Sequence, residues 1–408
     1  IERNRVTYVL GDNDVMEGNC PMRWKKVELQ SLAEIVSGAT PKTTIDAYWG
    51  GEIEWATPKD LSKMSSKYIC ATPKKLTQSG LDSCSAKLLP IGSVLFSSRA
   101  PIGHVAINKV PMCTNQGFKS FVPDSNKISS DYLYWWLKSQ TDYLQSLGNG
   151  ATFKEVSKAT VAQIQIPLPF KNGKPDLDEQ KRIAAILDKA DAIRRKRRQA
   201  LQLTDDFLRS LFLDMFGDPV TNPMGWDTKA LKELGRISTG STPPSKLDAM
   251  FDGEIPFATP GDLKETWIET KRTVTQAGAK KSRTVEAGAT IVCCIGATIG
   301  KMGKAVQMTA FNQQLNAIEW YDEVTCDFGL EMMKFYKSKI AKDGASTTLP
   351  ILKKSRFEEI RVLHPPVELQ EEFSSLVRHQ EMLKNKLHSG LKDALFASLQ
   401  KSAFQGEL

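Results

Sequence analysis

The chain has 408 residues, of which 41 % are hydrophobic and 25 % are charged, and its formal net charge is +8. This length and composition predict two or three globular domains and exclude a disordered or fibrous protein. The positive charge is compatible with a polyanionic partner, although basic proteins of this size are common. The longest apolar runs, such as residues 291–295, are far shorter than the about 20 residues needed to cross a bilayer.

The start of the sequence and its cysteines bear on where the protein works. The sequence begins at Ile1, which suggests an incomplete or processed N-terminus, and no charged-then-apolar export signal opens it. The seven cysteines have no paired spacing, which disfavours a disulfide framework and fits a reducing cytoplasm. Because neither a C-x-x-C nor an H-x-x-x-H pattern occurs, we expect a cytoplasmic protein without a structural zinc.

The most informative pattern in the chain is an internal repeat. Residues 51–61 read GEIEWATPKDL, and residues 253–263, about 200 residues later, read GEIPFATPGDL. Other matches keep the same order: Trp24 with Trp226, Leu32 with Leu234, Thr40-Pro41 with Thr242-Pro243, Thr77-Gln78 with Thr275-Gln276, Ile102-Gly103 with Ile299-Gly300, and Asn115-Gln116 with Asn312-Gln313. A repeat of this length indicates a duplicated domain and not a solenoid unit.

Each copy combines strands with short helices. β-Branched and aromatic runs at 93–97 and 290–294, bounded by Gly and Pro, predict strands of a mixed α+β domain. Apolar spacing at 132–138 and 330–339 predicts short helices in the two copies. At the start of the chain, residues 10–24 echo residues 216–226, so the chain is expected to begin near the end of a helical unit, as a circular repeat would.

Each copy ends in a proline-marked strand that leads into a long helix. Apolar residues spaced by three and four predict helices over about 178–216 and about 368–401, each with one apolar stripe. Asp176 and Glu179 predict a capping box at the first helix start, and the prolines after Gly217 end that helix. The residues expected to build the helix pair or to bind a partner are Ile183, Arg194, Arg197, Leu211, Leu376, Leu383, Leu387 and Leu395.

These patterns divide the chain into five segments. They are an N-terminal segment at 1–23, a first globular domain at 24–175, a central helix at 176–218, a second globular domain at 219–366 and a C-terminal helix at 367–408.

Within the central helix, residues 194–198 are five consecutive cations that point all the way round the helix. They form either a solvated surface or contacts with phosphates or an acidic partner. Arg197, near the apolar stripe, could pair with an acid across the helix pair.

Motifs of DNA-modifying enzymes are missing from the sequence. The double prolines at 243–244 and 365–366 lack the Asp or Asn and the aromatic residue that an adenine methyltransferase needs. Residues 296–301 are one residue short of a P-loop and precede a methionine. Asp176, Glu179 and their neighbours resemble a nuclease metal site only faintly, because they crowd into one helical turn. We therefore expect no catalysis by this chain.

The doubled block, the Asn-Gln pairs and the proline-to-helix endings resemble the specificity subunit of type I restriction-modification systems. Residues 175–187 resemble the start of that family's central helix, and 366–376 the start of its C-terminal helix. The resemblance covers nearly the whole chain. It implies two similar mixed α/β target-recognition domains separated by two long antiparallel helices, which act as a coiled-coil spacer.

The resemblance also implies the partners. Each domain would read one half of a split site in double-stranded DNA, and two methyltransferase subunits and a motor-nuclease subunit would join the chain. S-adenosylmethionine and ATP would belong to those subunits, so no cofactor is expected here.

A helix of about 38 residues is on the order of 57 Å long, whereas one DNA turn is about 34–36 Å. The helix could therefore act as a ruler that sets the gap between half-sites.

Arg99 is the leading candidate for base recognition. It lies in the expected loop 97–103, and the second copy has Ile295 or Gly296 at this place. Domains that read different half-sites should differ at base-reading positions, and arginine can contact guanine with two hydrogen bonds. The alternatives are a phosphate contact or plain surface charge.

Other candidates are weighed against structural roles. Amides of the Asn-Gln pairs suit adenine edges but could equally tie loops together, while Gln314, opposite Gly117, is the better base-reading candidate. Thr57-Pro58-Lys59-Asp60 and its second copy are expected to form turns in which Asp accepts backbone bonds. The complete set of expected DNA contacts is Thr40, Lys42, Lys59, Ser98, Arg99, Asn115, Gln116, Thr152, Thr242, Lys264, Lys301, Gln313, Gln314 and Thr347.

Two other functions stay open at this point. The chain could be a non-catalytic coiled-coil scaffold that binds protein partners, with globular domains that bind something other than DNA. It could also be a DNA-modifying enzyme whose catalytic residues carry no recognisable motif.

Overall fold

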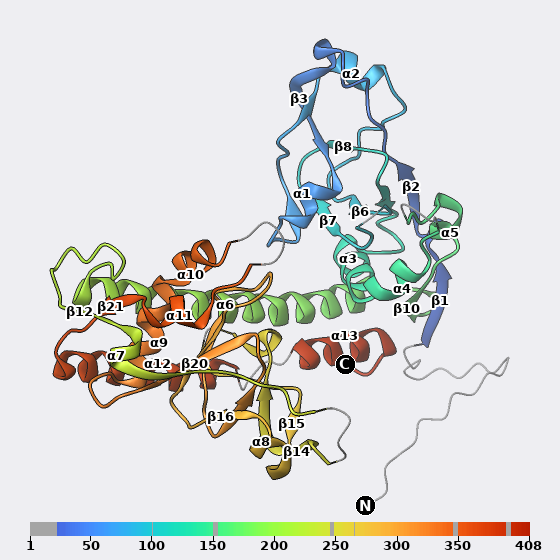
Figure 1. Cartoon of the computed structure of the whole chain (residues 1–408). Coiled ribbons are helices and arrows are strands. Elements are labelled where there is room, and N and C mark those ends of the chain that lie inside the picture. Colours follow the sequence, from blue (N-terminus) through green and yellow to red (C-terminus); the bar gives the residue numbers. More distant parts are fainter. Residues whose placement is uncertain are drawn as a thin grey trace, which may run out of the picture. The chain divides into compact units, whose positions relative to one another are not determined.

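The computed structural model describes residues 23–99, 101–149, 154–244, 249–264, 266–345, 350–388 and 393–408. The chain forms two compact units (Figure 1). Unit 1 comprises Ile1–Arg195 and Leu391–Leu408, and unit 2 comprises Lys196–Gly390. The echo predicted for the N-terminal segment falls almost wholly on residues 1–22, which lie outside the described residues.

The described residues of unit 1 form three sheets. The largest has the order β2-β9-β6-β7-β4, with β2 at Ala33–Ser37, β9 at Lys119–Pro123, β6 at Val94–Phe96, β7 at Val105–Asn108 and β4 at Tyr68–Ile69. The second has the order β5-β3-β8, with β5 at Lys75–Leu76, β3 at Trp49–Ala56 and β8 at Met112–Thr114. The third has the order β1-β10-β11, with β1 at Arg23–Glu28, β10 at Gln165–Lys171 and β11 at Lys174–Pro175.

Short helices cover these sheets. They are α1 at Pro58–Ser62, α2 at Gln78–Asp82, α3 at Ser130–Ser139, α4 at Thr141–Ser146 and α5 at Lys158–Ala162, with 3-10 turns at Leu29–Ser31 and Asp46–Tyr48. Helix α3 is buried nearly all round, and its run of tyrosine, leucine and tryptophan joins the core with Phe96 and Phe121. Ser129 caps α3 by accepting a hydrogen bond from the backbone N–H of Tyr132.

Unit 2 repeats this architecture. One sheet has the order β13-β20-β17-β18, with β13 at Gly235–Thr239, β20 at Leu315–Trp320, β17 at Thr290–Cys293 and β18 at Met302–Lys304. A second has the order β15-β14-β19-β16, with β15 at Thr273–Val274, β14 at Phe251–Ala258, β19 at Thr309–Phe311 and β16 at Arg283–Val285. Strands β12 (Thr228–Ala230) and β21 (Arg361–Leu363) form a third.

The duplication is also visible in the strand pairing. In unit 1, β3 lies between antiparallel β5 and parallel β8, and in unit 2, β14 lies between antiparallel β15 and parallel β19. The helices of unit 2 are α7 at Leu231–Leu234, α8 at Gln276–Lys280, α9 at Cys326–Phe335, α10 at Lys337–Asp343 and α11 at Lys354–Glu358, with a 3-10 turn at Pro260–Asp262. The predicted α+β class and the predicted pair of similar domains are confirmed.

Helix α6 spans Leu177–Phe216, 40 residues, and contributes to both units. Gly217 ends it with a φ of +73°, a left-handed conformation that favours glycine. The predicted capping box is only half formed. The Asp176 carboxylate accepts from the N–H of Glu179 at 3.0 Å, but the Glu179 carboxylate binds Arg182 instead of returning to Asp176. The backbone N–H of Asp176 donates to Pro169 and so needs no second partner.

The C-terminal helical region is described as α12 at Val367–His388 and α13 at Asp393–Gln405. In unit 1, α13 runs antiparallel to the first part of α6, because Arg182 donates to the Leu408 carbonyl while Arg194 lies over the Phe396 ring. In unit 2, α12 runs antiparallel to the second part of α6. There, Lys384 pairs with Asp205, and Phe212 packs against Phe373 at a centroid distance of 5.5 Å. The predicted antiparallel pairing of long helices is confirmed.

The buried faces of these helices follow the predicted stripes only in part. Ile183 is buried as expected, and Leu211 is partly buried in the core of unit 2. In contrast, Leu376, Leu383 and Leu395 have exposed fractions of 39 %, 46 % and 61 %, so the core does not use them. Phe373 and Val377, which belong to the same predicted stripe, are buried in the core of unit 2 as expected. The side chain of Leu387 lies outside the described residues.

Candidate nucleic-acid interface

The repeated block builds the same capped turn in both units. In unit 1 the Asp60 carboxylate accepts hydrogen bonds from the backbone N–H and the hydroxyl of Thr57, at 2.8 and 2.7 Å. In unit 2 the Asp262 carboxylate accepts the same two bonds from Thr259, at 2.8 and 2.6 Å. The predicted role of both aspartates as turn builders is therefore confirmed, and each turn follows the buried end of strand β3 or β14.

The Asn-Gln pairs lie directly beside these turns. The backbone N–H of Asn115 donates to the Ala56 carbonyl at 3.0 Å, and that of Asn312 donates to Ala258 at 3.1 Å. The Asn115 side-chain oxygen accepts from the N–H of Gly117, as the Asn312 oxygen accepts from Gln314. The asparagines thus shape a tight turn, which favours the structural alternative over adenine recognition for Asn115.

The glutamines of these pairs face solvent. Gln116 accepts a hydrogen bond from the Thr40 hydroxyl, and Gln313 accepts one from the Thr242 hydroxyl at 2.7 Å. Gln116 and Gln313 are exposed. In the described part of the chain, their side-chain N–H groups have no hydrogen-bond partner, so they can donate to another molecule. We call these two pairs, Thr40 with Gln116 and Thr242 with Gln313, the Thr–Gln surfaces.

The segment that carries Arg99 joins this surface through the backbone. The N–H of Ser98 donates to the Gly117 carbonyl at 2.9 Å. Ser97 and Ser98 have no exposed surface, and the Ser98 hydroxyl donates to the same carbonyl. The prediction that Ser98 contacts DNA is therefore wrong. The segment expected to be an exposed loop continues strand β6 into the interior, so the Ser98 hydroxyl does not reach solvent.

Arg99 emerges at the surface next to two other charges. Its side chain is 45 % exposed, and its Nε atom lies 3.6 Å from an oxygen of Glu155. The other oxygen of Glu155 lies 3.1 Å from the ammonium of Lys119, whose side chain is only 10 % exposed. The charge of Glu155 is thus neutralised by Lys119, which lies on the interior side of it. The terminal guanidinium nitrogens of Arg99 have no partner among the described residues.

The remaining candidates are dispersed. Lys42 and Lys59 are exposed, and within the described ranges their ammonium groups meet no carboxylate. Lys264 pairs with Glu269 at 3.0 Å, and Lys301 is half-buried. The remaining three fall into two groups. Gln314 is half-buried and its side-chain oxygen accepts from Asn312, whereas Thr152 and Thr347 lie outside the described residues.

Lys67, whose side chain is only 9 % exposed, was not among the predicted site residues, and it links the globular part of unit 1 to α6. The ammonium of Lys67 lies 2.8 Å from Asp131 of α3 and 2.6 Å from Asp188 of α6. The indole N–H of Trp135 also donates to Asp188, at 2.9 Å. Burial lowers the pKa of Lys67, but its two carboxylate partners outweigh this effect and raise the pKa above its usual range.

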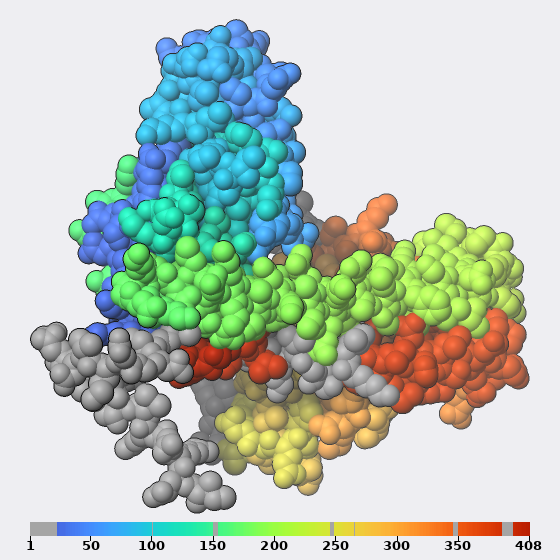
Figure 2. Space-filling view, turned by 180° about the vertical axis from the view of Figure 1, so that it is seen from behind, coloured from blue at the N-terminus to red at the C-terminus, as the bar shows by residue number. Residues whose placement is uncertain are grey.

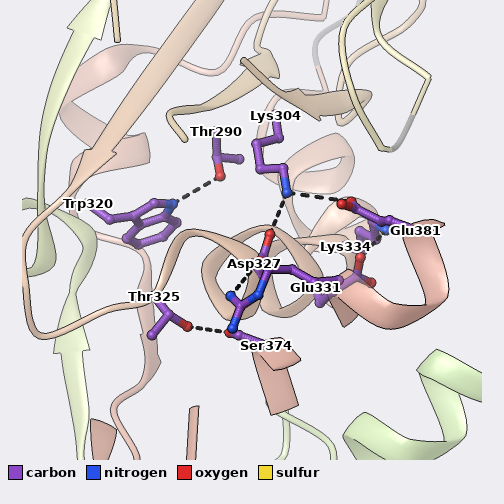
Figure 3. Close-up of polar contacts among 10 residues, drawn as sticks. Thr290, Lys304, Trp320, Thr325, Asp327, Glu331, Lys334, Ser374 and Glu381 are labelled. Atoms are coloured by element: carbon purple, nitrogen blue, oxygen red, sulfur yellow. Dashed lines mark hydrogen bonds and ion pairs between the residues drawn. The ribbon is translucent and has the colours of Figure 1, made fainter. Parts of the chain in front are cut away.

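Unit 2 has a corresponding ion cluster with different donors (Figure 3). Asp327, which follows Thr325 as Asp131 follows Ser129, accepts from Lys304 of β18 and from Arg378 of α12. Lys304 also lies 3.5 Å from Glu381 of α12. Burial lowers the pKa of Lys304, and its ion pair with Asp327 outweighs this and raises it. In each unit a largely enclosed lysine therefore ties the globular part to a long helix.

Two classes of site have no support in the described part of the chain. No group of three or more His, Cys, Asp or Glu residues is placed there to hold a metal ion. None of the helices described is both long and apolar enough to cross a membrane. What the described residues do offer is the Thr–Gln surface, built once in each unit.

The comparison with protein families is decisive for this arrangement. The family described as the type I restriction modification DNA specificity domain matches residues 21–203 and again residues 223–395. The chain belongs to this family. The two matches correspond to the two copies found in the sequence.

Relatives in the family include proteins of the same length. The MjaIX specificity subunit of a type I restriction enzyme from Methanocaldococcus jannaschii is 28 % identical over 418 residues, which cover 94 % of each chain. The EcoR124I/EcoR124II specificity subunit from Escherichia coli is 29 % identical over 178 residues, 41 % of this chain and 42 % of that one. The family thus includes a relative that matches along almost its whole length.

Solved structures show the same fold. The S subunit of a type I restriction-modification system from M. genitalium superposes with a TM-score of 0.59 at 16 % identity, covering 96 % of this chain and 98 % of that one. A chain from a type I system studied for complex assembly and conformational transition superposes with a TM-score of 0.50 at 17 % identity, covering 95 % and 99 %. The type I specificity fold is therefore established for this chain.

Proposed function

We propose that this chain is the DNA-recognition subunit of a type I restriction-modification complex. It reads a bipartite site in double-stranded DNA, with one half-site for each unit, and directs methyltransferase and restriction subunits to that site. The observation that carries the proposal is the doubled Thr–Gln surface, in which Thr40 with Gln116 and Thr242 with Gln313 form the same contact. Exposed amide donors without a partner among the described residues can donate to base edges and to phosphates.

Helix α6 supports a split site. Its 40 residues correspond to about 60 Å at about 1.5 Å per residue, which exceeds the about 34–36 Å of one DNA turn. Its first part belongs to unit 1 and its second part to unit 2. In this proposal the length of the helix sets the number of base pairs that are left unread between the half-sites.

The helices also offer a surface for protein partners. In unit 2, Leu203 and Phe207 of α6 have exposed fractions of 59 % and 54 %, and Met382 and Leu383 of α12 have 57 % and 46 %. One side of α6 is open in the space-filling view (Figure 2). Several large apolar side chains exposed on one helix pair are typical of a protein interface. We assign this surface to a methyltransferase subunit, and S-adenosylmethionine and ATP chemistry to the partner subunits.

The proposal is tested by binding and activity measurements on the same preparation. The chain assembled with its methyltransferase subunits should shift genomic DNA fragments that contain its site, and the affinity should fall steeply as salt rises. The chain alone, incubated with methyl donor or with magnesium, should neither methylate nor cut DNA. Methylation or cleavage by the chain alone would support an enzyme instead. Binding to protein partners without any salt-dependent binding to DNA would support a protein scaffold.

A further inference from the structure

The two copies differ in charge at one equivalent backbone bridge. In unit 1 an isolated antiparallel bridge joins Arg99 to Glu155, and in unit 2 one joins Ile295 to Ile351. The sequence alone left Ile295 and Gly296 as alternatives for the counterpart of Arg99. Because the bridge pairs Ile295, and not Gly296, with Ile351, Ile295 is the counterpart of Arg99.

Neighbouring hydrogen bonds confirm the equivalence. In unit 1, Ser98 donates its N–H to Gly117 and accepts from the N–H of Val156 at 2.8 Å. In unit 2, Cys294 donates its N–H to Gln314 and accepts from the N–H of Leu352, also at 2.8 Å. The adjacent residues, Arg99 with Glu155 and Ile295 with Ile351, therefore occupy the same place beside the Asn-Gln turn.

The third charge of this group is replaced as well. Lys119 pairs with Ser37 across strands β9 and β2, and Asn316 pairs with Thr239 across β20 and β13. Lys119 neutralises Glu155, whereas Asn316 is buried and its side-chain oxygen accepts from Thr239 at 2.7 Å. The bridge thus carries a net charge of about +1 in unit 1 and is uncharged in unit 2.

The fold does not account for this difference. The same backbone bridge forms with a charged pair and with an apolar pair, so neither is required by the architecture. Ile351 has an exposed fraction of 44 %, although exposing a large apolar side chain beside a polar turn gains nothing in stability. Positions on a common scaffold that differ in chemistry and face solvent are where binding specificity is placed.

We propose that this bridge is the position that distinguishes the two half-sites: Arg99 reads a guanine for unit 1, and Ile295 with Ile351 contact the methyl group of a thymine for unit 2. The inference rests on the proposed function. Glu155 contacts Arg99 at Nε, which leaves both terminal nitrogens for O6 and N7 of guanine. The thymine methyl group is the apolar feature of the major groove, and an isoleucine pair matches it.

The experiment uses the complex with its methyltransferase subunits and a panel of duplexes in which each base pair of the site is substituted singly. Arg99→Gln should reduce the preference for guanine at one base pair of one half-site by roughly 10- to 100-fold. The other half-site should be read as before. Lys42→Gln, a cation of the same unit, is the matched control and should weaken binding to all duplexes alike, with a smaller salt dependence.

The isoleucine pair is tested with duplexes in which each thymine in turn is replaced by uracil, which lacks only the methyl group. The wild-type complex should lose several-fold in affinity at one thymine of the second half-site. Ile295→Ala with Ile351→Ala should lose affinity for the thymine duplex and no longer distinguish it from the uracil duplex. Thermal unfolding of each variant reports whether the fold is retained.

The outcomes separate this inference from the proposed function. If the wild-type complex reads both half-sites but Arg99→Gln keeps its guanine preference, or weakens both half-sites equally, the inference is wrong and the proposed function stands. If the folded double alanine variant prefers the thymine duplex over the uracil duplex as strongly as the wild type does, the second assignment is wrong. If the wild-type complex binds all duplexes alike, the proposed function is wrong and the inference with it.

Discussion

The hydroxyl of Thr242 donates a hydrogen bond of 2.7 Å to the side-chain oxygen of Gln313, although the two residues lie far apart in the sequence. Thr40 and Gln116 form the same pair in the other unit. Because the bond holds the glutamine oxygen, the amide N–H groups are presented outward in a fixed direction. The pair is thus a framework for presenting donors, and it is built identically in the two copies.

Thr242→Val should weaken binding to one half-site only. The variant removes the bond that orients Gln313, so the glutamine loses its fixed direction and the affinity for duplexes with that half-site falls. Stability should change by less than about 1.5 kcal/mol, because a hydrogen bond between exposed groups contributes little net. Titration of duplexes in which one half-site is scrambled checks this, with Thr40→Val as the matched variant in unit 1. Equal loss at both half-sites would contradict it.

Asp262→Ala should destabilise unit 2 by about 1–3 kcal/mol, because the backbone N–H of Thr259 then loses its partner at the start of a partly buried turn. Asp262 has an exposed fraction of only 8 %. Denaturant unfolding followed by hydrogen exchange localises the loss, which should stay within unit 2. Asp60→Ala is the matched change in unit 1. An unchanged midpoint for both variants would show that the turn is held by other contacts.

Much of the fold follows from pattern. The ordered duplication predicted two similar domains, and apolar spacing predicted the long helices, because these signals are local or repeated. The exposure of Leu376 and Leu383 was not predictable, since leucines at helical spacing look alike whether they face a core or a partner. Lys67 and Lys304 were missed for a different reason: Lys67 precedes β4, Lys304 ends β18, and the two do not occupy matching positions of the repeat.

The candidate site was predicted in part. Pairing of Thr40 with Gln116 brings together two predicted residues from distant segments, and Arg99 is exposed as expected. The burial of Ser98 was missed because a serine after a strand gives no sign of which way the chain turns. The role of Glu155 was also missed, since its contact with Arg99 depends on a bridge between distant segments.

Asp327→Ala should be among the most destabilising single changes in unit 2. It leaves Lys304 buried with only Glu381, at 3.5 Å, as a carboxylate partner in the described cluster. Removing one member of a buried ion pair costs about 3–5 kcal/mol. In unit 1, Asp131→Ala should cost less, because Asp188 still holds Lys67 at 2.6 Å. Chemical unfolding of the two variants side by side measures the difference, and an equal or reversed order would contradict the account.

The acid stability of unit 1 should depend on Glu54. Burial raises the pKa of Glu54, but hydrogen bonds from Lys75 and Thr72 outweigh burial and bring the pKa below its usual value of 4.5. Since the folded carboxyl binds its proton more weakly than the unfolded one, its contribution is fully present above about pH 4.5 and is lost as the pH falls through the lower folded pKa.

Glu54→Gln should therefore destabilise unit 1 at neutral pH and flatten the loss of stability below about pH 4.5. Comparing the unfolding free energies of wild type and variant across that range isolates this carboxyl from the others. Unit 2 provides an internal control, because Pro256 occupies the matching position of the repeat. A variant whose acid profile parallels the wild type would rule out this role for Glu54.

Phe207→Glu should prevent assembly with the methyltransferase subunit while unit 2 stays folded. The ring has an exposed fraction of 54 %, so a charge there costs the fold little but would be buried in the proposed interface. Analytical ultracentrifugation of the mixed subunits measures assembly. Asp206→Lys, a charge change one residue away, serves as the control. Normal assembly of Phe207→Glu would place the partner elsewhere.

The central claim is that one chain reads two separate half-sites through two copies of one domain. It is tested most directly by sequencing the duplexes that the assembled complex retains from a library of random sequence. We expect two short specified blocks separated by a stretch with no preference. A single uninterrupted block, or no enrichment at all, would contradict it.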